Sequence, residues 1–132
     1  LNNYRKCLSL LTTHKERFHA QMEYAFAEVE SKVQDLTKDV IDRDVSNWGT
    51  GYKPLPLDFI QGPEDPLYPQ LKELVHQNLR FYLDQRTDEG IWNISWNWGQ
   101  YSEVFAVVSR YWQGILAVER YKILKAFRED LS

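Results

Sequence analysis

The stretch Asp84–Tyr101, DQRTDEGIWNISWNWGQY, holds three of the five tryptophans of the chain. Trp92, Trp96 and Trp98 alternate with other residues, so their rings lie on one side if the segment is extended. A lone glycine, Gly90, stands two residues before the first of them. The segment is therefore either a binding surface or a structural clasp between the elements that flank it.

A helix is predicted on each side of this segment. The first opens at Asp65-Pro66 or Tyr68-Pro69, because proline suits a first helical turn, and it ends near Gln85. The second begins at Ser102, whose hydroxyl can cap it, and ends near Phe127. Apolar residues at steps of three and four give each helix one apolar face. They are Leu71, Leu74, Val75, Leu79, Tyr82 and Leu83 in the first, and Phe105, Val108, Trp112, Ile115, Leu116 and Ile123 in the second.

Helices are also predicted for the amino-terminal part of the chain. Helical periodicity runs from Thr13 toward Val45 and predicts one long helix. Thr13 and Glu16 have the spacing of a capping box at its start. Residues 1–11 form a separate short helix with its apolar residues on one face.

The stretch 48–69, WGTGYKPLPLDFIQGPEDPLYP, contains all five prolines and three of the six glycines. Prolines at this density deny the backbone its helical hydrogen bonds, but the apolar residues between them indicate an ordered connection packed on the helices. The predicted fold class is all-α: antiparallel helix hairpins with ordered Pro/Gly-rich and Trp-rich connections, in a single domain over residues 1–132.

Composition excludes several classes of function. Sixteen Lys and Arg against 19 Asp and Glu give a net charge of −3, which offers no general attraction to nucleic acid. No apolar run approaches the ~20 residues that span a bilayer. The single cysteine, Cys7, forms no internal disulfide, which suits a cytoplasmic protein. The chain begins with Leu1 rather than methionine, so we expect it to be a fragment of a longer chain.

Phe81–Trp92, FYLDQRTDEGIW, resembles the QW motif of the terpenoid cyclases and the related protein prenyltransferases. Gln85, Gly90 and Trp92 are the residues that match. The continuation WGQY…VFAVVSRYWQGILAVERYKILKAF is similar to the carboxy-terminal end of squalene-cyclase-like proteins. The resemblance implies a latch, in which the glutamine ties one helix end to the next helix start, the tryptophan covers it and the glycine permits the turn.

The same resemblance implies an α/α toroid, of which this chain is only an arc. It further implies that the chain supplies scaffold and part of an apolar cavity for an isoprenoid-like ligand. Trp96, Trp98, Tyr101 and Trp112 are the candidate cavity or binding aromatics. The implied partner is the rest of a longer chain or a second copy in a homo-oligomer.

No catalytic residue, cofactor or metal is predicted. The aspartate-rich acid of the cyclases needs neighbouring carboxyls that share a proton, whereas Asp42-Arg43-Asp44 is followed by Val45. Zinc would require the spacing of a ligand set. Such spacing is missing among Cys7, His14, His19 and His76.

Two alternatives remain open. Trp92, Trp96 and Trp98 could form a carbohydrate platform, since sugars stack on aromatic faces and amides bind hydroxyls; the amides are those of Asn93, Asn97 and Gln100. The chain could instead be a self-associating helical module that uses the long helix from Thr13 to Val45.

Overall fold

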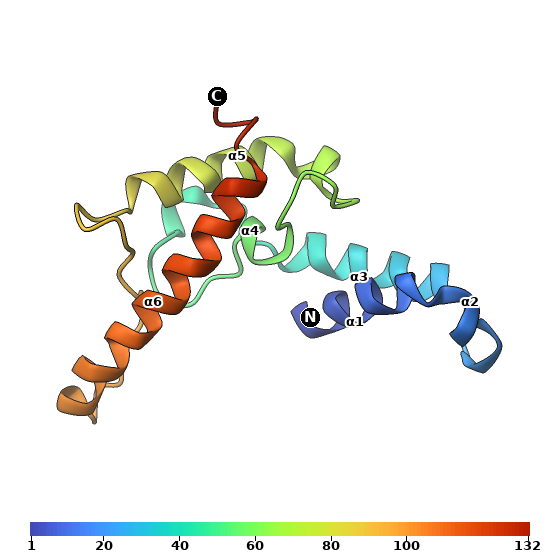
Figure 1. The fold of residues 1–132 in the computed structure, drawn as a ribbon, viewed down its shortest axis with the longest axis horizontal. Helices are drawn as coiled ribbons and strands as arrows, with labels where there is room; N and C mark the ends of the chain where they lie inside the picture. Colours follow the sequence, from blue (N-terminus) through green and yellow to red (C-terminus); the bar gives the residue numbers. More distant parts are fainter. The chain divides into compact units, whose positions relative to one another are not determined.

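The structure, a computed structural model, describes the backbone of residues 1–132 and every side chain except that of His19. Helices account for 63% of the chain, and the part that is described contains no strand, only a single bridge between Arg86 and Trp92. The predicted all-α class is therefore confirmed (Figure 1). In chain order the helices are α1 (Asn2–Thr13), α2 (Lys15–Phe18), α3 (Phe26–Val40), α4 (Pro56–Phe59), α5 (Tyr68–Asp84) and α6 (Ser102–Ala126), with short 3-10 turns at His19–Gln21 and Val45–Asn47.

The chain divides into two compact units, residues 1–41 and residues 42–132. In the first unit the chain reverses direction at α2, after α1, and α3 returns along α1 to form an antiparallel hairpin (Figure 1). Phe26, Val33 and Thr37 are the residues that α3 buries. Their spacing of seven and four places them on one face of the helix.

The single long helix predicted from Thr13 toward Val45 is wrong. Thr13 is the last residue of α1, and its hydroxyl bonds back to the carbonyl of Ser9 rather than capping a new helix. Met22 and Ala25 have extended backbone, and α3 begins only at Phe26. The break contains neither proline nor glycine. Residues 14–25 thus form the connection through which α3 returns along α1.

The second unit is built around α5, which begins at Tyr68 and ends at Asp84, close to the predicted bounds. Its buried side includes Leu71, Val75 and Leu79, and α4 packs against it. The Pro-rich connection packs as predicted through most of its apolar residues, whereas Tyr52 is 87% exposed. The buried ones include Trp48, Leu55, Leu57 and Ile60.

One buried side chain of α5 is polar. Asn78 has no exposed surface, and its Oδ1 accepts a hydrogen bond of 3.0 Å from the backbone N–H of Leu57 at the start of α4. Its Nδ2 has no partner among the described residues. A buried N–H without an acceptor is costly. Asn78 satisfies the N–H of Leu57 but leaves its own Nδ2 unsatisfied, and the hydrogen bond that it accepts fixes α4 on α5.

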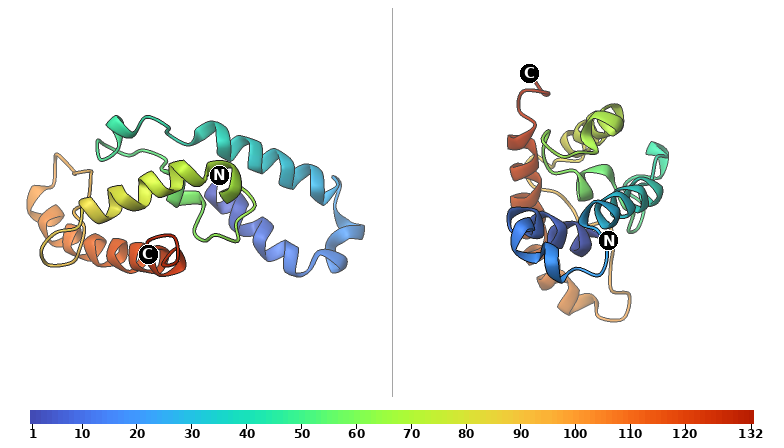
Figure 2. Two further views of the ribbon diagram at one scale, coloured as in Figure 1. Left: turned by 90° about the horizontal axis from the view of Figure 1, so that it is seen from above. Right: turned by 90° about the vertical axis from the view of Figure 1, so that its right-hand side faces the viewer.

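Helix α6 has two different halves. Its carboxy-terminal end packs against α5, where Ile123 and Phe127 are buried, while its amino-terminal half extends away from α5 beside the Trp-rich segment (Figure 1 and the right view of Figure 2). Tyr101 is the N-cap and makes no side-chain cap, so the predicted capping by Ser102 is wrong. The apolar face predicted for this helix is buried only near its end.

The chain closes where the segment after α6 meets the start of α5. The hydroxyl of Tyr68 donates to Oδ1 of Asp130 at 2.8 Å and lies 3.1 Å from Nε2 of His76. The same Nε2 is 3.4 Å from Oδ1 of Asp130. The ring of Phe127 covers Tyr68, with 5.4 Å between centroids. We call these three polar side chains the Tyr68–His76–Asp130 cluster.

Replacing Asn78 tests the anchoring of α4. Asn78→Ala leaves the buried N–H of Leu57 without an acceptor, so we expect the free energy of unfolding to fall by ~1–3 kcal/mol. Urea unfolding followed by tryptophan fluorescence measures it, since all five tryptophans lie in residues 42–132. Asn97→Ala, at an exposed position, is the matched control; equal losses in the two variants would contradict the assignment.

The contacts of Tyr68 make the stability of the fold depend on pH. Burial, followed by the hydrogen bond to Asp130, raises the pKa of Tyr68 from 10.0 to about 12. Between these values the unfolded chain releases a proton that the folded chain keeps, so stability falls as pH rises through this range. Tyr68→Phe removes this contribution. We expect the stability difference between wild type and variant to shrink from pH 10 to pH 12 in urea titrations; parallel pH profiles would contradict it.

Candidate functional site

A tight turn follows α5 and brings Trp92 back to the end of that helix. Gln85 caps α5 through its backbone N–H. Hydrogen bonds of 2.8 Å from Thr87 N–H to the Ile91 carbonyl and from Gly90 N–H to the Thr87 carbonyl then close the turn. Gly90 has φ +78, in the left-handed region that glycine enters without strain. A Cβ there would also lie 3.2 Å from the hydroxyl of Tyr121, which would have to move slightly, so the positive φ is the main reason that the turn needs glycine.

Trp92 closes this turn onto the helix. Its side chain has no exposed surface, and its indole N–H donates to the backbone carbonyl of Tyr82 in the last turn of α5. Carbonyls in a last turn have no partner within the helix, so a buried one needs a donor from elsewhere. The indole therefore satisfies a helix-end acceptor and covers it with apolar surface at the same time.

Helix α6 is attached to the same turn by two consecutive residues. The hydroxyl of Tyr121 donates to the Gly90 carbonyl at 2.7 Å, and its ring packs edge-on against Trp92 with centroids 5.2 Å apart. The guanidinium carbon of Arg120 lies 4.2 Å from the centre of the Tyr82 ring and 5.4 Å from that of Trp92. Such cation–π contacts strengthen when the cation is partly desolvated. We call Tyr82, Gly90, Trp92, Arg120 and Tyr121 the clasp.

A carboxylate from α4 completes the electrostatics of the clasp. Oδ2 of Asp58 accepts a 2.8 Å hydrogen bond from the Leu55 N–H and so caps α4. Burial raises the pKa of Asp58, while that hydrogen bond and the charge of Arg120 oppose the rise. Burial also raises the pKa of Tyr82 and lowers the pKa of Arg120. The three groups bring α4, α5 and α6 together around one half-buried positive charge.

The remaining aromatic residues of the Trp-rich segment pack on the amino-terminal half of α6. Trp96 meets Trp112 edge-on at 5.7 Å, and Trp98 meets Phe105 at 5.6 Å. Unlike Trp92, two of them keep much of their surface: Trp98 is 43% exposed and Trp112 is 39% exposed, whereas Trp96 and Phe105 are half-buried. Tyr101 is more exposed still, at 62%. The alternating tryptophans therefore lie in two different environments, because Trp92 is buried and Trp98 is open to solvent.

The predicted latch residues take different positions. Gly90 and Trp92 lie together in the clasp, whereas Gln85 is exposed, and its side chain forms no hydrogen bond to any described residue. Only the backbone of Gln85 contributes to the helix end. Arg120 and Tyr121 are members of the clasp that the sequence does not mark, because residues about thirty positions away carry no local sign of contact with the turn.

The other candidates for chemistry are not members of the clasp. Asp44 caps the turn at Val45–Asn47, and hydrogen bonds from the Ser46 side chain and backbone lower its pKa. A lowered pKa keeps the carboxyl ionised, which is the reverse of what a general acid requires. Cys7 is exposed on α1. The side chain of His19 lies outside the described residues, and among the rest no three His, Cys, Asp or Glu side chains gather closely enough for a metal ion.

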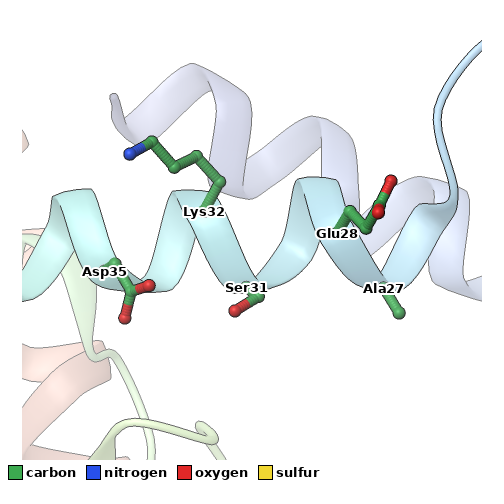
Figure 3. A pocket seen from close by; sticks show the side chains of 5 residues that line it. All are labelled: Ala27, Glu28, Ser31, Lys32 and Asp35. Carbon is green, nitrogen blue, oxygen red and sulfur yellow. The ribbon is translucent and has the colours of Figure 1, made fainter.

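A shallow depression occurs on α3 in the first unit. It is lined by exposed residues of that helix alone, with Ala27, Ser31 and Asp35 along one edge and Glu28 and Lys32 on the side of α1 (Figure 3). Asp35 is paired with Lys38 at 2.8 Å, which lowers the pKa of the carboxyl. Ligand sites are usually concave and enclosed, so this surface carries no functional assignment.

Comparison of the chain with protein-family models, with characterised proteins and with solved structures found no match. Among the described residues, no helix combines the length and the apolar character needed to cross a membrane.

The clasp predicts that two tryptophans, Trp92 and Trp98, differ strongly in their contribution to the free energy of unfolding. Trp92→Ala removes a fully buried ring and leaves the Tyr82 carbonyl unpaired, so we expect a loss of ~3–5 kcal/mol in the free energy of unfolding. Trp98→Ala, at a half-exposed position, is the matched control and should cost less. Urea titration followed by far-ultraviolet circular dichroism measures both, and equal costs would contradict the clasp.

The turn predicts a steep penalty at Gly90. Gly90→Val must hold a β-branched residue at positive φ and displace the Tyr121 hydroxyl, so we expect a marked fall in the thermal midpoint. Gly99→Val is the matched control, because a Cβ at Gly99 meets no atom within 4 Å and its φ is not positive. A Gly90→Val variant as stable as the control would show that the turn does not need glycine.

Proposed function

We propose that this chain is an arc of an α/α toroid of the terpenoid-cyclase and prenyltransferase type, in which it supplies scaffold and part of the wall of an apolar cavity. In this proposal it carries no catalytic group of its own. The ligand is an apolar, isoprenoid-like molecule held by the assembled ring. The proposal rests on the likeness of the clasp to the QW motif and on the exposed face of α6.

The clasp is the observation that carries this proposal. The QW resemblance implies a tryptophan that covers a helix end after a glycine turn, and Trp92 and Gly90 have that arrangement beside α5. Gln85 departs from the implied role, since its side chain is exposed. The support therefore comes from two of the three motif residues and from the helix end that they close.

The exposed face of α6 supports an incomplete ring. Its apolar side chains follow one another at steps of three and four and remain open: Val104, Val107, Tyr111, Ile115 and Val118, with exposed fractions between 46% and 70%. Contiguous apolar surface of this kind is typical of an interaction site. In a toroid, the neighbouring helix pair of a longer chain would cover it.

A carbohydrate platform is the second candidate, because one observation favours it. Trp98 and Trp112 present open indole surface, and the amides of Asn93 and Gln113 lie nearby, joined by a 2.9 Å hydrogen bond. Trp92 cannot belong to such a platform, because it is fully buried.

Added negative charge on the exposed face of α6 tests the incomplete-ring proposal. The 132-residue chain should self-associate through its open face, giving concentration-dependent sedimentation. Val107→Glu with Val118→Glu should shift it toward monomer, whereas Lys6→Glu, at an exposed position of α1, is the control for added negative charge. A wild-type chain that stays a compact monomer at all concentrations would count against the incomplete-ring proposal.

A ligand-binding measurement distinguishes the apolar cavity from the carbohydrate platform. If the chain is part of an apolar wall, a long-chain isoprenoid alcohol should quench tryptophan fluorescence less strongly in Trp112→Ala than in wild type, while neutral oligosaccharides should have no effect. Binding of an oligosaccharide that is lost in Trp98→Ala with the fold intact would replace the cavity proposal by the carbohydrate platform.

A further inference from the structure

Three donor atoms of different chemical type meet in the Tyr68–His76–Asp130 cluster. They are a phenolic oxygen, an imidazole nitrogen and a carboxylate oxygen, and the distances between them are 2.8, 3.1 and 3.4 Å. Each atom is within reach of both of the others. The three therefore form a small triangle rather than a chain of hydrogen bonds.

The backbone holds this triangle from two directions. Tyr68 and His76 are eight residues apart on α5, just over two helical turns, and their side chains meet at 3.1 Å. Asp130 comes from the segment after α6, 62 residues beyond Tyr68. Tyr68 is buried, and the side chains of His76 and Asp130 are only 26% and 20% exposed. The donors are thus brought together by the fold itself.

We propose that the Tyr68–His76–Asp130 cluster is a binding site for a divalent transition-metal ion of the zinc class. Zinc lies about 2.0–2.2 Å from nitrogen and oxygen ligands, so neighbouring ligands in tetrahedral or octahedral geometry are about 2.8–3.6 Å apart. All three distances of the cluster fall within this range. Imidazole nitrogen with oxygen donors is a set that suits zinc and copper.

The charges and protons of the site balance. The ion binds neutral His76 through Nε2, with the ring proton on Nδ1, and it binds the Asp130 carboxylate and the Tyr68 phenolate. The phenol proton passes to solvent, so the two negative ligands neutralise the two positive charges. Because binding releases a proton, affinity rises with pH.

Tyrosine is the donor that a search for metal-binding residues overlooks. No three His, Cys, Asp or Glu side chains among the described residues converge on one point, and here the phenol of Tyr68 takes the third position. Glu73, exposed on α5 one turn before His76, adds negative charge that acts on Tyr68. A positive charge also lies close, since Nζ of Lys72 is 6.0 Å from the centre of the Tyr68 ring.

Metal titration of the 132-residue chain tests the proposal. After treatment with a chelator, Zn²⁺ is added and the heat of binding is recorded for wild type, His76→Gln, Tyr68→Phe and His14→Gln. We expect one ion per chain in wild type, at least tenfold weaker binding in the first two variants, and unchanged binding in His14→Gln, whose exposed imidazole lies on the other unit. Circular dichroism without metal checks that each variant is folded.

The outcomes show which of the three side chains bind the metal ion. Wild-type binding no stronger than that of a Tyr68→Phe, His76→Gln double variant would overturn the site. Loss of binding in His76→Gln with full binding in Tyr68→Phe would overturn the phenol as a ligand and with it the three-donor site. If a variant does not fold, substoichiometric Co²⁺ added to wild type should broaden the imidazole signals of His76 before those of His14. The reverse order would overturn the proposal without any variant.

Discussion

The hydrogen bond from the Trp92 indole to the Tyr82 carbonyl is the contact on which the arrangement of residues 42–132 depends. A helix end is a poor place for apolar cover, because its last carbonyls still need donors. An indole is suited to the task, since it is the largest apolar side chain and carries one N–H. Once Trp92 lies across the end of α5, Tyr121 and Arg120 have a surface to pack on, and α6 follows.

The clasp also explains why α6 changes character along its length. Near Arg120 and Tyr121 it lies against α5, and Ile123 and Phe127 are buried beyond them. Before that point α5 has already ended, so the helix has only the Trp-rich segment beside it. Its apolar side chains there have no helical neighbour within this unit. The length of α5 thus determines how much of α6 is covered.

Part of this architecture could be predicted from the sequence. Helix α5 has strong periodicity and a proline in its first turn, and both features are local, so its bounds were predictable within a few residues. Gly90 and Trp92 stood out for the same reason, as a turn residue followed by a large aromatic. The tryptophan alternation was misleading, because burial falls along the segment as it leaves α5, from Trp92 with no exposed surface to Trp98 at 43%.

Other features depend on contacts between distant residues and left no mark in the sequence. The break before Phe26 has no proline or glycine to signal it, and the benefit of the break lies in the packing of α1 on α3. Arg120 reads as one more charge on a long helix, yet it lies over two aromatic rings. The pairing of Tyr68 with Asp130 spans 62 residues. Neither periodicity nor propensity contains such information.

The separations of these contacts along the chain suggest an order of assembly. The Trp92 bond joins residues ten apart, Leu57 and Asn78 are 21 apart, Tyr121 and Gly90 are 31 apart, and Tyr68 and Asp130 are 62 apart. The entropy lost in closing a flexible loop grows by about 0.6 kcal/mol for each doubling of its length. We therefore expect the turn at Gly90 to form while α6 is still unattached, so that the transition state for folding contains the end of α5 but not the closure of the chain. Substitutions around Trp92 would then slow folding, whereas those at Asp130 would chiefly speed unfolding.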